Sequence, residues 1–127
     1  MARRSMTDSS IAGRRILIVE DEALIALNLE TILSEAGAEL VHAKTAGEAL
    51  NHLGSRRFDA AILDVQLADG SSYKVADELR RQGTPFVFQS GYLTIREGYA
   101  DIPFLEKPFT AEGVKDAVAK VLDQAAA

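Results

Sequence analysis

The chain has 127 residues, of which 47% are hydrophobic and 26% charged, the size and composition of one folded domain rather than of a disordered or collagenous protein. It contains no cysteine, which excludes disulfides, thiolate metal sites and a cysteine nucleophile. The formal net charge of −5 disfavours direct binding to nucleic acid, and the sequence shows neither a signal peptide nor an apolar run of about 20 residues that would span a membrane. We therefore expect a cytoplasmic protein.

The beginning of the chain differs in character from the rest. Residues 1–13 are small, polar and without hydrophobic periodicity, so they are expected to form a flexible leader. The domain proper is expected to occupy residues 14–124, followed by an alanine-rich tail at residues 125–127. Residues 16–19, Ile-Leu-Ile-Val, form a continuous apolar run, which is typical of a strand buried on both faces of a parallel sheet.

Helical and strand patterns then follow one another along the chain. Residues 25–36 place apolar side chains on one helical face, and Gly37 can end this helix. A more polar strand is predicted at 39–43, and Thr45 can cap a helix that extends to about residue 53. The same periodicities predict further strands at 58–63, 85–88 and 102–105, and further helices at about 71–81 and 114–122.

This alternation predicts a doubly wound α/β fold, in which helices cover both faces of a five-stranded parallel sheet. The segment between Ser90 and Ile102 contains two glycines and offers little room, so a short or irregular helix is expected there. In such folds, ligands bind beyond the carboxyl ends of the strands. The residues at those ends are therefore the first candidates for function.

Polar side chains follow four of the predicted strands. Glu20 and Asp21 follow the first strand, Asp64 the third, Ser90 the fourth and Lys107 the fifth. Three carboxylates at one edge repel one another unless a hard cation neutralises them, and Mg²⁺ prefers such oxygen ligands. A lysine and a hydroxyl nearby suit a phosphoryl group, which leaves Asp64 as the nucleophile that would form an acyl phosphate.

Over residues 14–124 the chain resembles the receiver domains of response regulators, of the CheY-like superfamily. The likeness rests on the acidic pair Glu20 and Asp21, on Asp64, on Ser90 and on the Lys107-Pro108 pair, all in the family's order on the expected elements. The resemblance implies a flavodoxin-like (βα)5 fold, Mg²⁺ as cofactor and a cis peptide bond between Lys107 and Pro108.

The resemblance also implies particular roles. Asp64 would be the phosphoacceptor, and the metal ligands would be Glu20, Asp21, Asp64 and the backbone carbonyl of Gln66. Ser90 and Lys107 would bind the phosphoryl group, Phe104 would be the switch aromatic, and Gln66 and Tyr92 would tune the rate of dephosphorylation. Phosphorylation would change the surface formed by the segment after Ser90, the strand at 102–105 and the closing helix.

One stretch resembles a narrower group. The residues PFVFQSGY, with the shortened region after them, are similar to the PFxFATGY motif of the alphaproteobacterial FAT GUY receivers. Gln89 and Ser90 stand here where that motif has Ala and Thr. This similarity implies a sensor histidine kinase of the HWE or HisKA_2 type as partner.

The leading hypothesis is a stand-alone signalling domain, not an enzyme, that catalyses only its own phosphorylation and dephosphorylation. Two alternatives are weaker. A phosphatase of the haloacid dehalogenase type would need a second acid where Gln66 stands, and the intact set of five site residues disfavours a pseudo-receiver that only binds proteins. His42 and His52 are interpreted as surface or edge residues. The sequence leaves open the downstream partner, a phosphorylation-dependent dimer and whether the chain is part of a larger regulator.

Overall fold

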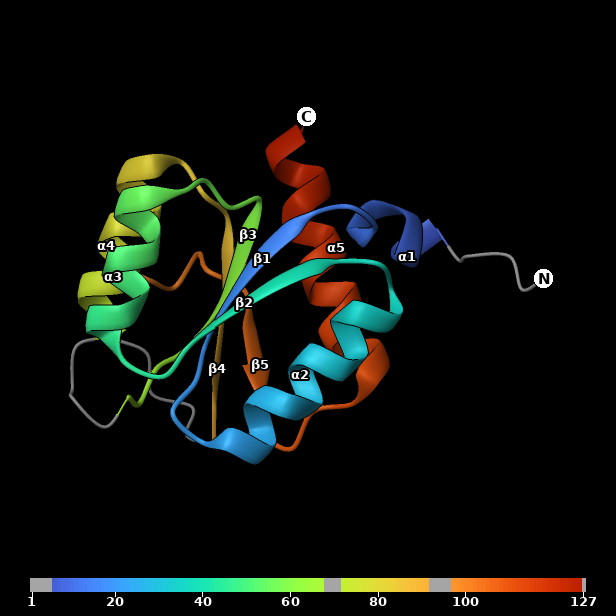
Figure 1. The fold of residues 1–127 in the computed structure, drawn as a ribbon, viewed down its shortest axis with the longest axis horizontal. Helices are drawn as coiled ribbons and strands as arrows, with labels where there is room; N and C mark the ends of the chain where they lie inside the picture. The colour runs from blue at the N-terminus through green and yellow to red at the C-terminus, as the bar shows by residue number, and fades with distance from the viewer. Residues whose placement is uncertain (1–5, 68–71, 92–96, 127) are drawn as a thin grey trace.

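A computed structural model describes residues 6–67, 72–91 and 97–126, which form a five-stranded parallel sheet between two layers of helices (Figure 1). The strand order is β2-β1-β3-β4-β5. The strands are β1 (Arg15–Val19), β2 (Glu39–Ala43), β3 (Ala60–Asp64), β4 (Phe86–Ser90) and β5 (Phe104–Glu106). Because all four neighbouring pairs are parallel, the carboxyl ends of all five strands lie along one edge. The predicted doubly wound α/β fold is confirmed.

Helices cover both faces of the sheet. The helices are α1 (Met6–Ile11), α2 (Ala23–Glu35), α3 (Ala46–Ser55), α4 (Ser72–Gln82) and α5 (Ala111–Ala126). α1, α2 and α5 lie against one face, and α3 and α4 lie against the other (Figure 1). Throughout the described parts of the chain, none of the helices combines the length and apolar character that crossing a membrane requires.

The apolar run of β1 is continuous because this strand has a helical layer on each side. Ile16 and Ile18 pack with α2 and α5, whereas Leu17 and Val19 pack with α3 and α4. Successive side chains of a strand point to opposite faces, so a central strand with two covered faces needs an apolar residue at each position. The predicted burial of this strand is therefore confirmed.

Two predicted helix boundaries have a visible local cause. Thr45 accepts a hydrogen bond from the backbone N–H of Glu48 at 3.1 Å, so it caps α3 as expected. Gly37 follows α2 with a φ of 96°, a left-handed conformation that favours glycine. Gly37 therefore marks the end of α2 before β2, and Thr45 marks the start of α3 after β2.

The beginning of the chain differs from the expected flexible leader. Residues 6–11 form α1, and Ile11 is fully buried in the core shared with α2 and α5. Lys115 Nζ lies 3.1 Å from Asp8 Oδ1, which joins α1 to α5. The prediction is wrong for these residues because one branched side chain in a polar stretch reaches the core. At the other end, α5 extends through Ala126, into the expected tail.

The connection between β4 and β5 contains no helix among its described residues, 91 and 97–103, in line with the expected irregular element. Tyr99 attaches its second half to α4. The Tyr99 hydroxyl donates a hydrogen bond to Asp77 Oδ1, and the guanidinium carbon of Arg80 lies 4.5 Å from the centre of the Tyr99 ring. Two residues of α4 thus hold this connection against the helical layer.

Replacement of Ile11 by alanine tests the attachment of α1. We expect Ile11→Ala to lower the free energy of unfolding by about 2–4 kcal/mol, because it leaves a cavity in the shared core. The matched control is Met6→Ala at the exposed start of α1, which should change it by less than about 0.5 kcal/mol. Urea denaturation measures both. Equal effects of the two substitutions would contradict a docked α1.

Candidate functional site

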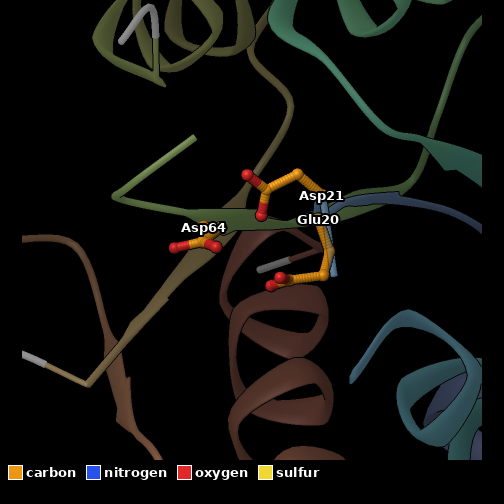
Figure 2. A group of neighbouring side chains, drawn as sticks. All are labelled: Glu20, Asp21 and Asp64. Atoms are coloured by element: carbon orange, nitrogen blue, oxygen red, sulfur yellow. The ribbon is translucent and has the colours of Figure 1, made fainter. Parts of the chain in front are cut away.

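Three carboxylates converge at the carboxyl edge of the sheet. Glu20 and Asp21 follow β1 directly, and Asp64 is the last residue of β3, the strand beside it. Each offers an oxygen atom, and these atoms all lie within 4.8 Å of one another (Figure 2). Glu20 and Asp64 are buried, with 0% and 3% of their surface exposed. The structure therefore brings together the three acids that the sequence placed at strand ends.

Glu20 has an unusually high proton affinity for a glutamate. Burial and then the neighbouring charge of Asp64 raise the pKa of Glu20 from 4.5 to about 7. The backbone N–H of Glu22 opposes this effect, because it donates a hydrogen bond to Glu20 Oε1 at 3.1 Å. Full ionisation of Glu20 beside Asp64 is therefore unfavourable unless further positive charge is supplied.

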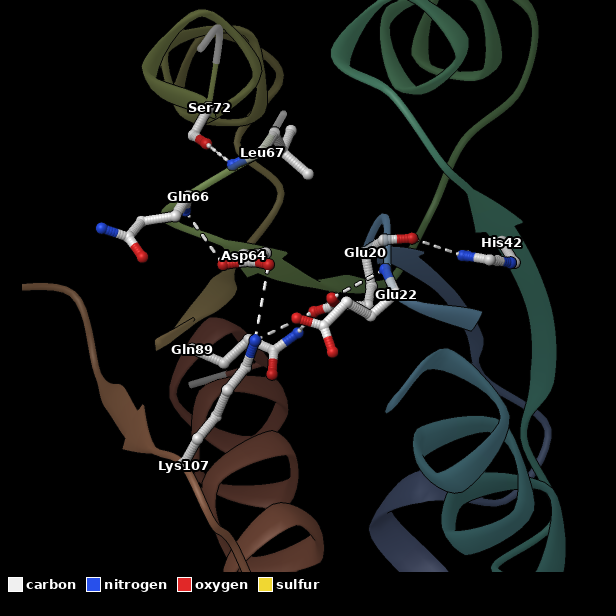
Figure 3. Close-up of polar contacts among 9 residues, drawn as sticks. All are labelled: Glu20, Glu22, His42, Asp64, Gln66, Leu67, Ser72, Gln89 and Lys107. Carbon is white, nitrogen blue, oxygen red and sulfur yellow. Dashed lines mark hydrogen bonds and ion pairs between the residues drawn. The ribbon is translucent and has the colours of Figure 1, made fainter. Parts of the chain in front are cut away.

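Lys107 supplies part of that charge. Its Nζ atom lies 3.5 Å from Glu20 Oε2 and 3.5 Å from Asp64 Oδ2 (Figure 3). The side chain reaches the acids from the residue after β5, and the peptide bond between Lys107 and Pro108 is cis, as the resemblance implied. One ammonium group is therefore shared between two buried carboxylates.

Backbone groups fix the other side of Asp64. Asp64 Oδ1 accepts a hydrogen bond from the backbone N–H of Gln66 at 2.9 Å. The backbone N–H of Leu67 in turn donates to Ser72 Oγ at 3.3 Å, at the start of α4 (Figure 3). The chain after β3 therefore turns back over the carboxylate, and it leaves Oδ2 facing Lys107.

The remaining predicted residues are placed as follows. Ser90 is the last residue of β4 and is buried, and its carbonyl accepts a hydrogen bond from the backbone N–H of Lys107 at 2.9 Å. Ser90 therefore lies at the edge of the sheet that carries the acids. Phe104 is paired in register with Phe88 and packs on the side of α3 and α4, outside the polar cluster. Tyr92 lies outside the described residues.

Two residues that contact the site were not among the sequence candidates. Gln89 Nε2 donates to Glu20 Oε2 at 2.5 Å, and His42 Nε2 lies 2.7 Å from the backbone carbonyl of Glu20 (Figure 3). His42 is half-buried on β2, so its interpretation as a plain edge residue was incomplete. A polar Gln89 inside an apolar strand was a visible signal for the first contact. No local pattern indicated the second.

The donor set fits a hard divalent cation. All three acids offer carboxylate oxygens, the ligand type that Mg²⁺ prefers, and together they carry more negative charge than Lys107 neutralises. A cation at this position would lower the repulsion between Glu20 and Asp64, and it would also bind a phosphate oxygen.

The fold and this edge together define a CheY-like α/β domain with three acids gathered at the carboxyl ends of its strands. The response regulator receiver domain family matches residues 16–124, and the chain belongs to this family. Receiver domains are signalling domains of two-component systems, in which histidine kinases phosphorylate them, and they bind Mg²⁺ at an acidic pocket.

Known relatives cover most of the chain. SdrG from Sphingomonas melonis Fr1 is 40% identical, with a TM-score of 0.76, over 88% of this chain and 98% of that one. TrrA from Thermotoga maritima, solved in complex with Mg²⁺-BeF, is 30% identical, with a TM-score of 0.77, over 85% and 98%. The regulator PhyR from Methylorubrum extorquens is 40% identical over 81 residues, which are 61% of this chain and 30% of that protein. The chain spans less than half the length of the curated relatives it matches.

The raised pKa of Glu20 predicts how stability depends on pH without divalent cations. Between pH 4.5 and about 7 the folded protein holds a proton on Glu20 that the unfolded chain releases, so the free energy of unfolding should fall as pH rises, by at most about 3 kcal/mol. Urea denaturation in EDTA across this range measures the fall. Glu20→Gln should remove most of it, and an unchanged slope in this variant would assign the effect to another group.

Proposed function

We propose that Asp64 is the phosphoacceptor of this receiver domain and that the domain catalyses its own phosphorylation with Mg²⁺. The observation that carries the proposal is the position of Lys107 Nζ, 3.5 Å from both Asp64 Oδ2 and Glu20 Oε2, beside the acidic triad. In this arrangement a buried carboxylate, an ammonium group and two further acids lie together at one edge, which supports a nucleophile beside a cation site. Phosphoryl transfer needs these groups in place more than it needs covalent help from the protein.

The proposed reaction starts from Asp64 Oδ2, the oxygen that faces Lys107. Oδ2 attacks phosphorus of a phosphohistidine or a small acyl phosphate, a new bond forms from this oxygen to phosphorus, and the bond to the donor breaks with its electron pair. Lys107 and the Ser90 hydroxyl would hold the equatorial oxygens, and Mg²⁺ would neutralise charge there. Hydrolysis of the acyl phosphate returns the carboxylate and releases inorganic phosphate.

The proposed metal ligands are Glu20, Asp21, Asp64 and the backbone carbonyl of Gln66. The three carboxylates are supported by their mutual approach to within 4.8 Å. The Gln66 carbonyl is supported less directly, by the hydrogen bond that brings the Gln66 backbone to Asp64. The structure of the relative TrrA in complex with Mg²⁺-BeF supports a receiver site that takes this cation.

For the output, we propose that Ser90 and Phe104 couple the site to the face formed by the β4–β5 connection, β5 and α5. Ser90 and Phe104 lie on the neighbouring strands β4 and β5, and the side chain of Phe104 is only partly buried, which supports this proposal. We also propose that Tyr92 and Gln66 tune the rate of dephosphorylation. A stand-alone form, a cytoplasmic location and a phosphorylation-dependent dimer also stay predictions.

We also propose that the domain belongs to the FAT GUY group and receives its phosphoryl group from an HWE or HisKA_2 kinase. The PFVFQSGY stretch, the absence of helix among residues 91 and 97–103, and the similarity to PhyR support this placement. A haloacid dehalogenase-type phosphatase is disfavoured, because the exposed Gln66 stands where its second acid would be.

Incubation with Mg²⁺ and a small acyl phosphate, followed by intact-mass analysis, tests the acceptor. The wild-type protein should gain one phosphoryl group, and Asp64→Asn should gain none, because an amide oxygen is a poor nucleophile. Asp116→Asn, on the exposed side of α5, is the matched control and should behave like the wild type. An unmodified wild-type protein, or equal labelling of Asp64→Asn, would sink the proposal.

Substitution of Asp21 tests the cation site separately. Asp21→Ala should weaken Mg²⁺ binding at least about tenfold, because the cation loses a carboxylate ligand. Glu22→Ala is the matched control, since it removes an exposed acid one residue later that is outside the triad. Isothermal titration calorimetry measures both. If the two variants bind Mg²⁺ alike, Asp21 is not a ligand.

A further inference from the structure

Gln89 is an unusual residue for its place in the fold. It lies in the central strand β4, between Phe88 and Ser90, and none of its surface is exposed. Its Nε2 donates to Glu20 Oε2 at 2.5 Å, while its Oε1 is buried without a hydrogen-bond partner in the described structure. A buried amide in which only one of the two polar groups is hydrogen-bonded lowers the stability of a core. Filling space does not explain it, because an apolar side chain would do so without this cost.

The environment of Glu20 indicates what the amide does. Glu20 Oε1 faces the backbone N–H of Glu22, and Oε2 faces both Gln89 Nε2 and Lys107 Nζ. The amide lies closer to Oε2 than the ammonium group does, at 2.5 Å against 3.5 Å. Gln89 is thus the nearer partner of this oxygen, and Lys107 stands between Glu20 and Asp64 rather than closing on Glu20.

The charge of the donor matters as much as its position. A neutral amide orients a carboxylate without cancelling its charge, so the carboxylate still attracts a cation. An ammonium group in the same place would neutralise Glu20 and would itself be unavailable to Asp64. A neutral donor at this position therefore leaves two charged groups free, the carboxylate for metal and the lysine for the phosphoryl oxygens.

We propose that Gln89 is a positioning residue of the metal site, which fixes the Glu20 carboxylate for Mg²⁺ and keeps Lys107 shared with Asp64. This inference rests on the proposed function, since it assigns a residue to the cation site of that proposal. Gln89 touches neither the reacting oxygen nor phosphorus, and it acts through Glu20. The position is one where this chain departs from the motif it resembles, which has alanine there.

The test compares Gln89→Met with the wild-type protein. Methionine has a similar volume and no donor, so packing is retained while the hydrogen bond to Glu20 is lost. We expect Mg²⁺ binding, measured by calorimetry, to weaken about tenfold, the loss of one hydrogen bond to a charged group. The midpoint of urea unfolding in EDTA should change little, because the loss of the hydrogen bond to Glu20 lowers stability while removal of the unpaired Oε1 raises it.

Two further variants separate positioning from packing. Val87→Ala creates a cavity at another fully buried position of β4, so it should lower the unfolding midpoint and leave Mg²⁺ affinity within about twofold of wild type. Gln89→Ala removes both donor and volume, and it should lose Mg²⁺ affinity as Gln89→Met does. If either Gln89 variant folds and binds Mg²⁺ as tightly as the wild type, the positioning role is wrong.

The outcomes distinguish this inference from the proposed function. Wild-type protein that binds Mg²⁺ but gains no phosphoryl group would end the acceptor proposal, while the Gln89 variants would still decide the positioning role. Equal Mg²⁺ binding by wild type and Gln89→Met would end only the inference on Gln89. Wild-type protein that binds no Mg²⁺ would overturn the metal site and the role of Gln89 together.

Discussion

The repulsion between Glu20 and Asp64 is the constraint on which this site depends. Both carboxylates are buried, and the parallel sheet holds their strands side by side, so the two acids cannot separate without disturbing the core. Burial first, and then this repulsion, raise the pKa of Glu20 to about 7. Lys107, the Glu22 backbone N–H and Gln89 relieve the repulsion in part. A divalent cation would relieve the rest, so the same repulsion that disfavours two charged acids at this edge would favour the binding of a cation there.

The same geometry explains why the site is assembled from distant parts of the sequence. A strand covered on both faces carries most of its polar side chains where it leaves the helical layers, and parallel strands all leave at the same edge. α2 begins at Ala23, and its N-cap residue Glu22 follows the acidic pair directly, so the N-terminal end of this helix favours negative charge there. The packing of the core therefore also determines where the acids lie.

The sequence predicted the helices, the strands and part of the site for two reasons. Helices and strands follow local hydrophobic periodicity, and the ends of parallel strands lie at one shared edge. Glu20, Asp21, Asp64 and Lys107 were found in this way. Ile11 was missed because one apolar side chain in a polar stretch has no period, and its burial depends on α5 more than 100 residues later. The contact of Gln89 with Glu20 was missed for a related reason, since the two residues are 69 positions apart and only the register of three strands brings them together.

β4 shows how closely the site and the rest of the domain are joined. Gln89 contacts Glu20, whereas the preceding Phe88 packs against Tyr99 with ring centres 6.0 Å apart, on the side of the β4–β5 connection. Adjacent residues of a strand share one stretch of backbone and face opposite ways. One peptide bond therefore joins the residue that contacts the buried carboxylate of Glu20 to the residue that packs against the β4–β5 connection.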